Sequence, residues 1–473
     1  MPPNVLMFGT GEYTTGFTAQ GASVSDKKTG VVALVMLDLK RRKLVGRLGM
    51  VGTNGKKMPQ IRAHMQAVLG DVYTDIDPSC IETFPADGVV DADAYLQAIT
   101  QFAAGDVAII FTPDDTHKKI ALACLEHGLH VLLTKPPVKT LEEHLQLAEV
   151  ARTKGVLCAV EVHKRYDPIY IDARDRIASL GPFSFFNAYM SQPKRQLDTF
   201  RAWAGRSSDI SYYLNAHHID FHVWCMRGDS RPERVTALCS DGVATGRLGV
   251  PTEDTITLAV NWRNKDDRHD AAACGGGSSA DNESVKFKHC SSDGSAKGAG
   301  QRGSFAGGSC GHAVYTSSWI APKSDVHSQQ RWFYMGQRGE VIVDQAHRGY
   351  TIATDDDGYS AVNPLFWKPT RDAATGLFSG QRCYGYISFE SFIAAASECA
   401  HGKAQASEFN QTLPTLETTV CATAILEAGR RSLDHGGQPM RLVYGDENSC
   451  IPLGIIPEAT QEKEDSVGKR VRR

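Results

Sequence analysis

The sequence predicts an α/β protein with two parts, a parallel-sheet part followed by a strand-rich part. Over the first 160 residues, short apolar runs alternate with segments of helical spacing, which is typical of strand–helix–strand units. One of these runs ends in a lysine followed by two prolines, and from Phe183 onward alternating and β-branched runs dominate. We therefore expect domains at 1–160 and 161–455, with a charged tail at 456–473.

The first predicted strand, Val5–Phe8, leads into a glycine-containing loop. Gly9 suits a tight turn, and Gly11 lets the backbone approach a pyrophosphate at a helix N-terminus. The third glycine of the usual dinucleotide fingerprint is replaced by Thr14, so an ordinary turn remains the alternative. The loop predicts a cofactor-binding set made of Gly9, Thr10, Gly11, Glu12 and Tyr13.

A second strand is predicted at Val31–Leu37, ending at Asp38. An acidic residue in that position accepts hydrogen bonds from the ribose diol of NAD. The basic run Lys40–Lys43 would instead suit a 2′-phosphate, or it is a solvated group of charges. We expect NAD, with NADP as the alternative.

The segment from Gly105 to Pro168 predicts a strand at Val107–Phe111, a helix at His117–His127 and a strand at His130–Leu133. The last of these strands ends in Thr134-Lys135-Pro136-Pro137. Because open α/β sheets bind ligands at the carboxyl ends of their strands, Lys135 is a candidate catalytic residue.

These motifs, taken in order, resemble those of the Gfo/Idh/MocA oxidoreductases, which are named for glucose–fructose oxidoreductase and inositol dehydrogenase. The motifs are GTG, Asp38, TPDDTH, HVLLTKPP and VHKRYDP, and the resemblance covers Asn4 to about Arg227 before resuming at Ala313–Tyr350 and Ala424–Leu442. It implies an N-terminal Rossmann domain and a C-terminal α/β domain with a large, open, mostly antiparallel sheet. It also implies a homodimer or homotetramer assembled through that sheet.

The resemblance assigns roles to residues on the substrate side. The family's Glu-Lys-Pro is Thr134-Lys135-Pro136 here, and the lysine contacts the reacting hydroxyl, where an ammonium stabilises a developing alkoxide. The family's Asp-x-x-x-His becomes Tyr213 and His217, which makes His217 the expected proton acceptor. Tyr213 is expected to touch the substrate or relay a proton. Asp220 is expected at the substrate, where it would orient an imidazole or cap local charge.

Two further loops match the family's cofactor and substrate contacts. The first, at Thr112–His117, resembles the loop that packs against the nicotinamide ribose in the family, although its polar residues also suit helix capping. The second borders the cofactor amide and the substrate, although a salt bridge of Arg165 is an equal alternative. The residues expected in these roles are Thr112, Pro113 and His117 from the first loop, and His163, Lys164 and Arg165 from the second.

Composition narrows the class of protein. The 473 residues carry a net charge of −3, so no nucleic-acid or membrane-surface partner is expected. The early strand leaves no room for a signal peptide, and the 12 cysteines contain no CxxC pair, which favours reduced thiols in the cytoplasm. His218 and His222 have a spacing that can ligate zinc, but no third ligand is evident nearby, so no metal is expected.

The second part reads as a sheet domain with an insertion. The segment 266–312 is rich in Gly, Ser and Ala and is expected to be an excursion between two strands. Trp319–Arg331 is polar for a strand and suggests a substrate-side rim containing His327, Gln330 or Arg331.

The sequence thus favours an NAD(P)-dependent oxidoreductase that moves a hydride between the nicotinamide and a carbinol or carbonyl of a sugar, sugar acid or cyclitol. Two alternatives remain open. One is an NAD-dependent glycosidase that oxidises its substrate transiently, and the other is a non-catalytic dinucleotide or sugar sensor.

Overall fold

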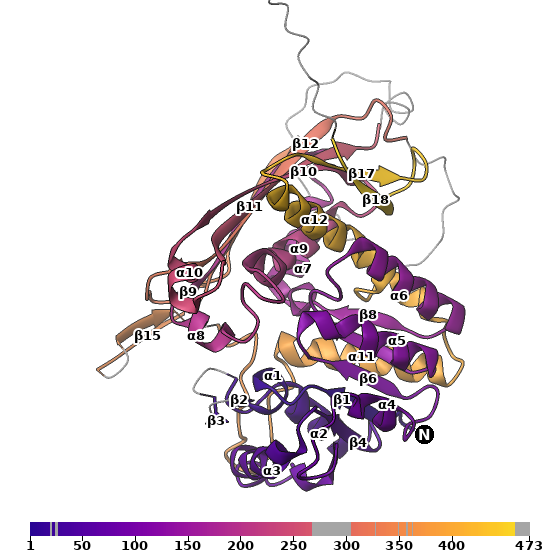
Figure 1. Cartoon of the computed structure of the whole chain (residues 1–473), viewed down its shortest axis with the longest axis vertical. Coiled ribbons are helices and arrows are strands. Elements are labelled where there is room, and N and C mark those ends of the chain that lie inside the picture. The colour runs from indigo at the N-terminus through magenta and orange to yellow at the C-terminus, as the bar shows by residue number, and fades with distance from the viewer. Residues whose placement is uncertain are drawn as a thin grey trace, which may run out of the picture.

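Two sheets organise the chain (Figure 1). The computed structural model describes residues 1–18, 21–23, 27–266, 304–326, 328–348, 350–355, 358–361 and 363–458. Most of the predicted insertion, His327 and nearly all of the charged tail lie outside the described residues.

The first sheet is entirely parallel, with six strands in the order β5-β4-β1-β6-β7-β8. Such a sheet buries both faces, and its strands are correspondingly apolar runs. The strands are β1 (Val5–Phe8), β4 (Leu48–Val51), β5 (Ile81–Phe84), β6 (Val107–Ile110), β7 (His130–Thr134) and β8 (Cys158–Glu161).

Helices cover the two faces of this sheet. Along β1, Val5 and Met7 belong to one core while Leu6 and Phe8 belong to the other, because successive strand residues point to opposite faces. The first core is closed by α2 (Val32–Arg41), α3 (Met58–Met65) and α11 (Tyr384–Ala400). The second core is closed by α4 (Ala94–Ile99), α5 (His117–Glu126) and α6 (Leu141–Lys154).

The second sheet has eight strands in the order β14-β13-β9-β12-β11-β10-β17-β18. All neighbours are antiparallel except β9 and β12, which run parallel. The strands are β9 (Phe183–Pro193), β10 (Ser230–Asp241), β11 (Glu253–Asn264), β12 (Cys310–Ala321), β13 (Gln329–Gly336), β14 (Gly339–Asp344), β17 (Met440–Tyr444) and β18 (Pro452–Pro457). The predicted α/β class, with a parallel sheet and a larger, mostly antiparallel sheet, is confirmed.

One face of the large sheet is packed and the other is open. Helices α7 (Pro168–Ile177), α9 (Ala216–Met226) and α12 (Leu416–Asp434) bury the inner face, and α12 also packs against α6 of the first part. On the open face Leu238 is 69% exposed and Ile342 is 67% exposed. The remaining short elements are α1 (Glu12–Thr15), α8 (Gln196–Phe200), α10 (Val243–Leu248) and the small pairs β2 (Phe17–Thr18) with β3 (Gly21–Ala22) and β15 (Thr351–Thr354) with β16 (Gly358–Ala361).

The strand predicted at Val31–Leu37 is wrong, because this segment is the helix α2. Every residue from Val32 to Leu37 is apolar and buried, so this stretch alone lacks the alternation of apolar and polar residues that marks a helix. The second strand of the sheet is β4, beginning ten residues after Asp38.

Helix α11 lies in the second predicted domain by sequence, but it packs against the parallel sheet of the first. Its residues Tyr386, Phe389 and Phe392 lie in the same core as Val5 and Leu132 of the parallel sheet. The chain therefore returns to the first part after completing most of the second sheet, and this brings residues from the second half of the sequence to the edge of the first sheet.

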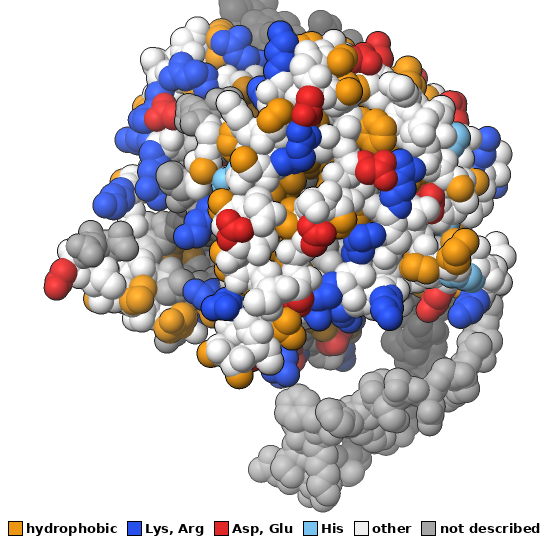
Figure 2. Space-filling model, turned by 90° about the horizontal axis from the view of Figure 1, so that it is seen from below, with side chains coloured by type: hydrophobic (Ala, Val, Ile, Leu, Met, Phe, Trp, Pro, Cys, Tyr) orange, Lys and Arg blue, Asp and Glu red, His pale blue; other side chains and the backbone are white. Residues whose placement is uncertain are grey.

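On the face of the molecule shown in Figure 2, neither charge dominates. In Figure 2, Lys and Arg side chains are intermixed with Asp and Glu side chains around scattered hydrophobic ones. Among the described residues, no helix is long and apolar enough to cross a membrane.

Candidate active site

The first candidate element is the glycine loop after β1. Gly9 has φ +104°, and a Cβ there would lie 2.0 Å from the carbonyl oxygen of Phe111, so only glycine fits where this loop meets β6. Around Gly11 no atom lies within 4 Å of where a Cβ would stand. The loop therefore combines a close backbone turn with open space, as a bound pyrophosphate requires.

The side chains around this loop are fixed. Tyr13 stacks on Phe111 with ring centroids 5.0 Å apart, and Glu12 accepts a hydrogen bond from the Ser23 hydroxyl. The Thr10 carbonyl accepts a hydrogen bond of 3.0 Å from Thr15. All five predicted residues of this loop thus lie together at the carboxyl end of β1, and cofactor contact by each stays a prediction.

His117 holds two neighbouring loops together. Its Nδ1 lies 3.0 Å from the carbonyl oxygen of Pro136, and its Nε2 lies 2.8 Å from that of Thr112. The ring is fully buried. His117 thus positions the Thr112-Pro113 loop beside the Lys135-Pro136 loop through backbone contacts, in place of the direct cofactor contact that the sequence predicts.

Lys135 follows Thr134 at the end of β7 and reaches toward the second part of the chain. Its Nζ donates to the backbone oxygen of Tyr213 and lies 4.3 Å from the centroid of the Tyr213 ring. Burial lowers the pKa of Lys135 to about 8, and the carboxylates of Asp114 and Glu161 partly oppose this effect. Tyr213 therefore serves as the resting partner of this ammonium group.

His217 lies in the first turn of α9 and belongs to the same cluster. Its ring centroid is 5.3 Å from that of His163, and its Nδ1 is buried without a hydrogen-bond partner among the described residues. Burial, and then the positive charges of Lys135 and Lys164, hold the pKa of His217 well below its usual value. The imidazole is therefore neutral at neutral pH, which is the form that accepts a proton.

Lys164 lies deeper in the same site and is 3% exposed. Its Nζ donates to the side-chain oxygens of Gln330 and Gln345. Burial lowers the pKa of Lys164 to about 7, the carboxylate of Asp167 opposes this, and the charges of Arg348 and Lys135 add to it. Its glutamine partners come from the large sheet and the turn after it, so it lies on the side of the site opposite the glycine loop.

Arg165 and Asp220 form a buried ion pair with each other. The guanidinium donates two hydrogen bonds, of 2.9 and 2.7 Å, to the two carboxylate oxygens, and both side chains are about 5% exposed. The predicted cofactor role of Arg165 and substrate role of Asp220 are therefore corrected to a positioning role, which was the salt-bridge alternative for Arg165. The pair ties the turn after β8 to the helix that carries His217.

Asp38 does not lie at the cofactor edge. It is fully buried in α2, where it accepts hydrogen bonds from Arg41 (2.6 Å), from the Tyr386 hydroxyl (2.6 Å) and from Gln381 (3.3 Å). The prediction that it binds the ribose is wrong, because the segment containing it is a helix whose carboxyl end faces the amino ends of the strands. Its role is to join α2 to α11.

His218 and His222 lie in the aromatic core beneath the site. The His218 Nε2 is 3.4 Å from the Tyr170 hydroxyl, and the His222 ring stacks on Phe186 with centroids 4.5 Å apart. The described residues contain no group of three or more His, Cys, Asp or Glu side chains able to hold a metal.

Several site residues were missed by sequence reasoning. Gln345 follows β14 and holds Lys164, while Phe366 packs 4.7 Å from the His163 ring. Glu161 ends β8, accepts a 3.0 Å hydrogen bond from Ser388 and lies 3.5 Å from His163. Only Glu161 had a sequence signal, since it is a charged residue at the carboxyl end of a buried strand. Gln330 was suggested by the polar rim, and His327 lies outside the described residues.

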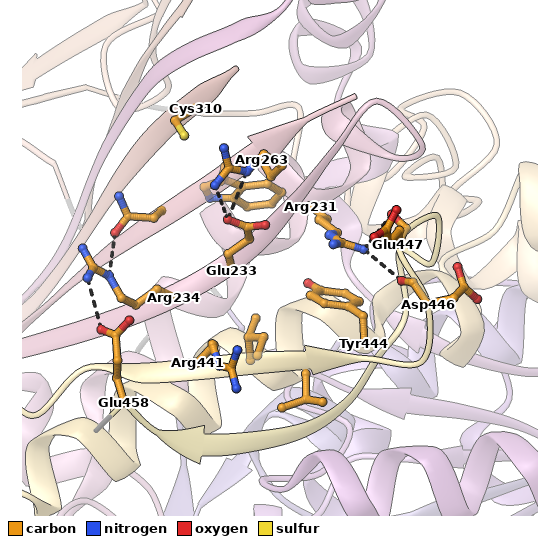
Figure 3. Close-up of a pocket in the computed structure, with 14 residues that line it drawn as sticks. Arg231, Glu233, Arg234, Arg263, Cys310, Arg441, Tyr444, Asp446, Glu447 and Glu458 are labelled. Carbon is orange, nitrogen blue, oxygen red and sulfur yellow. Dashed lines mark hydrogen bonds and ion pairs between the residues drawn. The ribbon is translucent and has the colours of Figure 1, made fainter. Parts of the chain in front are cut away.

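A separate cavity of about 660 Å³ lies at the other end of the large sheet, between β10, β11 and β17 (Figure 3). Four arginines and four carboxylates line it, and the structure gives two ion pairs among them, Arg263 with Glu233 and Arg234 with Glu458. None of the predicted site residues borders it.

Comparisons with known proteins support the interpretation of the first part. Residues 4–162 match the model of the oxidoreductase family with an NAD-binding Rossmann fold. The chain is 30% identical over 173 residues to scyllo-inositol 2-dehydrogenase (NADP(+)) IolW of Bacillus subtilis, covering 35% of this chain and 46% of that protein. It is 38% identical over 72 residues to scyllo-inositol 2-dehydrogenase (NAD(+)) of the same organism, covering 15% of this chain and 21% of that protein. These alignments span less than half of either relative.

The similarity in structure extends over nearly the whole chain. A solved structure of an inositol dehydrogenase homolog from Azotobacter vinelandii, complexed with NADH and myo-inositol, superimposes with a TM-score of 0.59. The match covers 93% of this chain and 97% of that one at 16% sequence identity. Both parts of the fold are therefore shared with this structure.

Proposed function

The chain belongs to the Gfo/Idh/MocA family of NAD-binding oxidoreductases, and on this basis we propose that it transfers a hydride between a nicotinamide cofactor and a carbinol or carbonyl carbon. The proposed substrate is a sugar, sugar acid or cyclitol. Both curated relatives described above are named as inositol dehydrogenases, one for NADP(+) and one for NAD(+).

A single observation carries this proposal. An ammonium group and a neutral imidazole, those of Lys135 and His217, come together beside the glycine loop although they are 82 positions apart in the sequence. A dinucleotide-binding protein without catalysis has no need for this combination of a cation and a proton acceptor.

The open space at Gly11 and the backbone turn at Gly9 fit the pyrophosphate of a dinucleotide. Gly9, Thr10, Gly11, Thr112 and Pro113 would hold it. When bound, the cofactor supplies the hydride acceptor, while the protein supplies position and charge.

The side chains of the site provide an acceptor for the hydroxyl proton of the substrate. In the oxidation of a hydroxyl, the O–H proton passes to the neutral imidazole of His217 while the carbon loses a hydride. The ammonium of Lys135 stabilises the negative charge that develops on the oxygen. Once protonated, His217 lies close to the charges of Lys135 and Lys164, which favours release of the proton to solvent.

The test begins with a thermal-shift screen of sugars, sugar acids and polyols in the presence of NAD or NADP, because a ligand raises the melting temperature of the protein that binds it. With a substrate found, Lys135→Ala and His217→Ala should each lower kcat by at least about 100-fold and leave the dinucleotide dissociation constant nearly unchanged. His218→Ala is the matched control, and it should lose much less activity because its ring lies in the aromatic core.

Two results would contradict this proposal. Full activity of Lys135→Ala on the substrate would show that the ammonium group is not needed to stabilise the substrate oxygen. Release of nitrophenol from a nitrophenyl glycoside without net NADH formation would instead identify a glycosidase.

We also propose that the open face of the large sheet forms a homodimer or homotetramer interface. Leu238 and Ile342 are exposed there at 69% and 67%, and exposed apolar side chains on an uncovered sheet face favour association. Sedimentation of the wild type should show the oligomer, and Leu238→Glu should shift it toward the monomer. A monomeric wild type would contradict the proposal.

A cytoplasmic location is proposed from the cysteines. The ten cysteines among the described residues are all free thiols, as in reducing compartments. Fractionation of cells that produce the protein tests this, and recovery from an oxidising compartment would contradict it.

A further inference from the structure

We propose that this chain selects NADP(H) over NAD(H), and that the loop Gly52–Lys57 binds the 2′-phosphate of the adenine ribose through Lys56 and Lys57. The inference deepens the proposed function, because it concerns the same dinucleotide site.

The position of the loop supports this assignment. The loop follows β4, which pairs directly with β1, so it lies next to the glycine loop at the carboxyl edge of the sheet. A Cβ on Gly52 would lie 2.9 Å from the side chain of Thr10, so the two loops are in contact. In Rossmann domains, the residue that reads the adenine ribose follows the second strand at this place.

No acidic residue is available on this segment to bind a ribose diol. From Leu48 to Gly70 the sequence contains neither Asp nor Glu, and the loop itself reads Gly-Thr-Asn-Gly-Lys-Lys. Of the three carboxylates between β5 and α4, those of Asp87 and Asp91 are already engaged. Asp87 pairs with Arg62, and Asp91 accepts a 2.8 Å hydrogen bond from the backbone of Asp93.

Two lysines occupy the loop and are exposed. Within the described residues, neither Lys56 nor Lys57 forms an ion pair or a side-chain hydrogen bond. The cations of the helix α2 differ, since Arg41 pairs with Asp38 and Arg42 with Glu390. The charges of Lys56 and Lys57 are therefore not neutralised within the described residues, and a phosphate of about −1.5 to −2 charge complements them.

The backbone of the loop is held in place. The Asn54 side chain accepts a 3.1 Å hydrogen bond from the backbone nitrogen of Lys56. The backbone nitrogen of Gly55 donates a 2.7 Å hydrogen bond to the Val89 carbonyl. A Cβ on Gly55 would lie 2.1 Å from the Ala86 carbonyl oxygen, so this turn is packed against the loop after β5. A fixed backbone turn lowers the ordering cost of binding, since only the two lysine side chains remain to be ordered.

Calorimetric titration of the full chain with NADP and with NAD tests the inference without any substrate. We expect NADP to bind at least about 10-fold tighter, and its dissociation constant to rise more steeply with salt. The variant Lys56→Ala/Lys57→Ala should lower NADP affinity about 10-fold and leave NAD affinity unchanged. Lys154→Ala is the control, because this exposed lysine ends α6 at the opposite edge of the sheet.

The outcomes separate this inference from the proposed function. Binding of neither dinucleotide would overturn the proposed function. Tighter binding of NAD, or an equal loss of both affinities in the double variant, would overturn only the choice of NADP. As a second measurement, adenosine 2′,5′-bisphosphate should bind more tightly than AMP, which differs from it only by the 2′-phosphate, and equal binding would contradict the role of the lysines.

Discussion

The buried pair of Arg165 and Asp220 gives a quantitative test of how the site is positioned. Asp220→Ala removes two charge-assisted hydrogen bonds, of 2.9 and 2.7 Å, each contributing about 1.5–3 kcal/mol. It also leaves a buried guanidinium whose nearest remaining contact given by the structure is the Trp224 ring, 5.5 Å away. Together these effects should lower the free energy of unfolding by about 3–5 kcal/mol.

The measurement is urea and thermal unfolding followed by tryptophan fluorescence. At about 2–4 °C per kcal/mol, the melting temperature of Asp220→Ala should fall by roughly 6–20 °C. The double variant Arg165→Met/Asp220→Leu should recover most of this loss, because it removes both charges and keeps the volume apolar. Activity should fall in both variants, since the pair ties the turn bearing Lys164 to the helix bearing His217.

The neighbouring helix α7 supplies a matched control. Arg176 and Asp172 form an ion pair there at 2.7 Å, but their side chains are 59% and 64% exposed. Asp172→Ala should therefore cost much less stability than Asp220→Ala, because solvent screens the exposed pair. The stabilising role of the buried pair is refuted if Asp220→Ala costs no more than Asp172→Ala, or if the double variant is less stable than the single one.

Three further predictions follow from the corrected placements. Asp38→Ser should lower the free energy of unfolding by about 1–3 kcal/mol and leave the ratio of the NADP and NAD dissociation constants unchanged; a changed ratio in calorimetric titration would restore a cofactor role for Asp38. Burial lowers the pKa of Lys164 from 10.5 to about 7, so between these pH values the unfolded chain binds more protons. The stability of the wild type relative to Lys164→Met should therefore rise by up to about 5 kcal/mol from pH 7 to pH 10.5, and pH-independent urea unfolding would contradict this. Deleting residues 267–303, which lie outside the described residues, and inserting a short linker should preserve dinucleotide binding, because β11 and β12 already pair up to Arg263 and Cys310; failure to fold would contradict it.

The parts of the site that were predictable lie at the ends of strands in the first sheet. Lys135, His163 and Lys164 follow buried apolar runs directly, and topology brings the carboxyl ends of parallel strands to one edge. Local sequence was enough there, because each residue's position follows from the strand that precedes it.

The parts that were not predictable depend on packing between distant segments. Gln345 reaches Lys164 across 181 positions of sequence, and nothing in its own surroundings indicates this partner. The Arg165–Asp220 pair joins two motifs that each looked functional alone. The prediction at Asp38 failed because a short run of apolar residues has the same pattern in a buried strand as in a buried helix. The second strand of the sheet begins ten residues later, at Leu48, so the loop expected to contact the adenine ribose was placed too early in the sequence.

The absence of the family's aspartate at Tyr213 changes the electrostatics of the site. The Arg165–Asp220 and Arg348–Asp167 pairs neutralise themselves, so around His217 there remain the positive charge of Lys135, which the carboxylates of Asp114 and Glu161 partly oppose, and the partial charge of Lys164. This surplus of positive charge, added to burial, holds His217 in its neutral, proton-accepting form. The same surplus stabilises negative charge on a substrate oxygen, so the groups that keep His217 unprotonated also favour the alkoxide that forms when the hydroxyl gives up its proton.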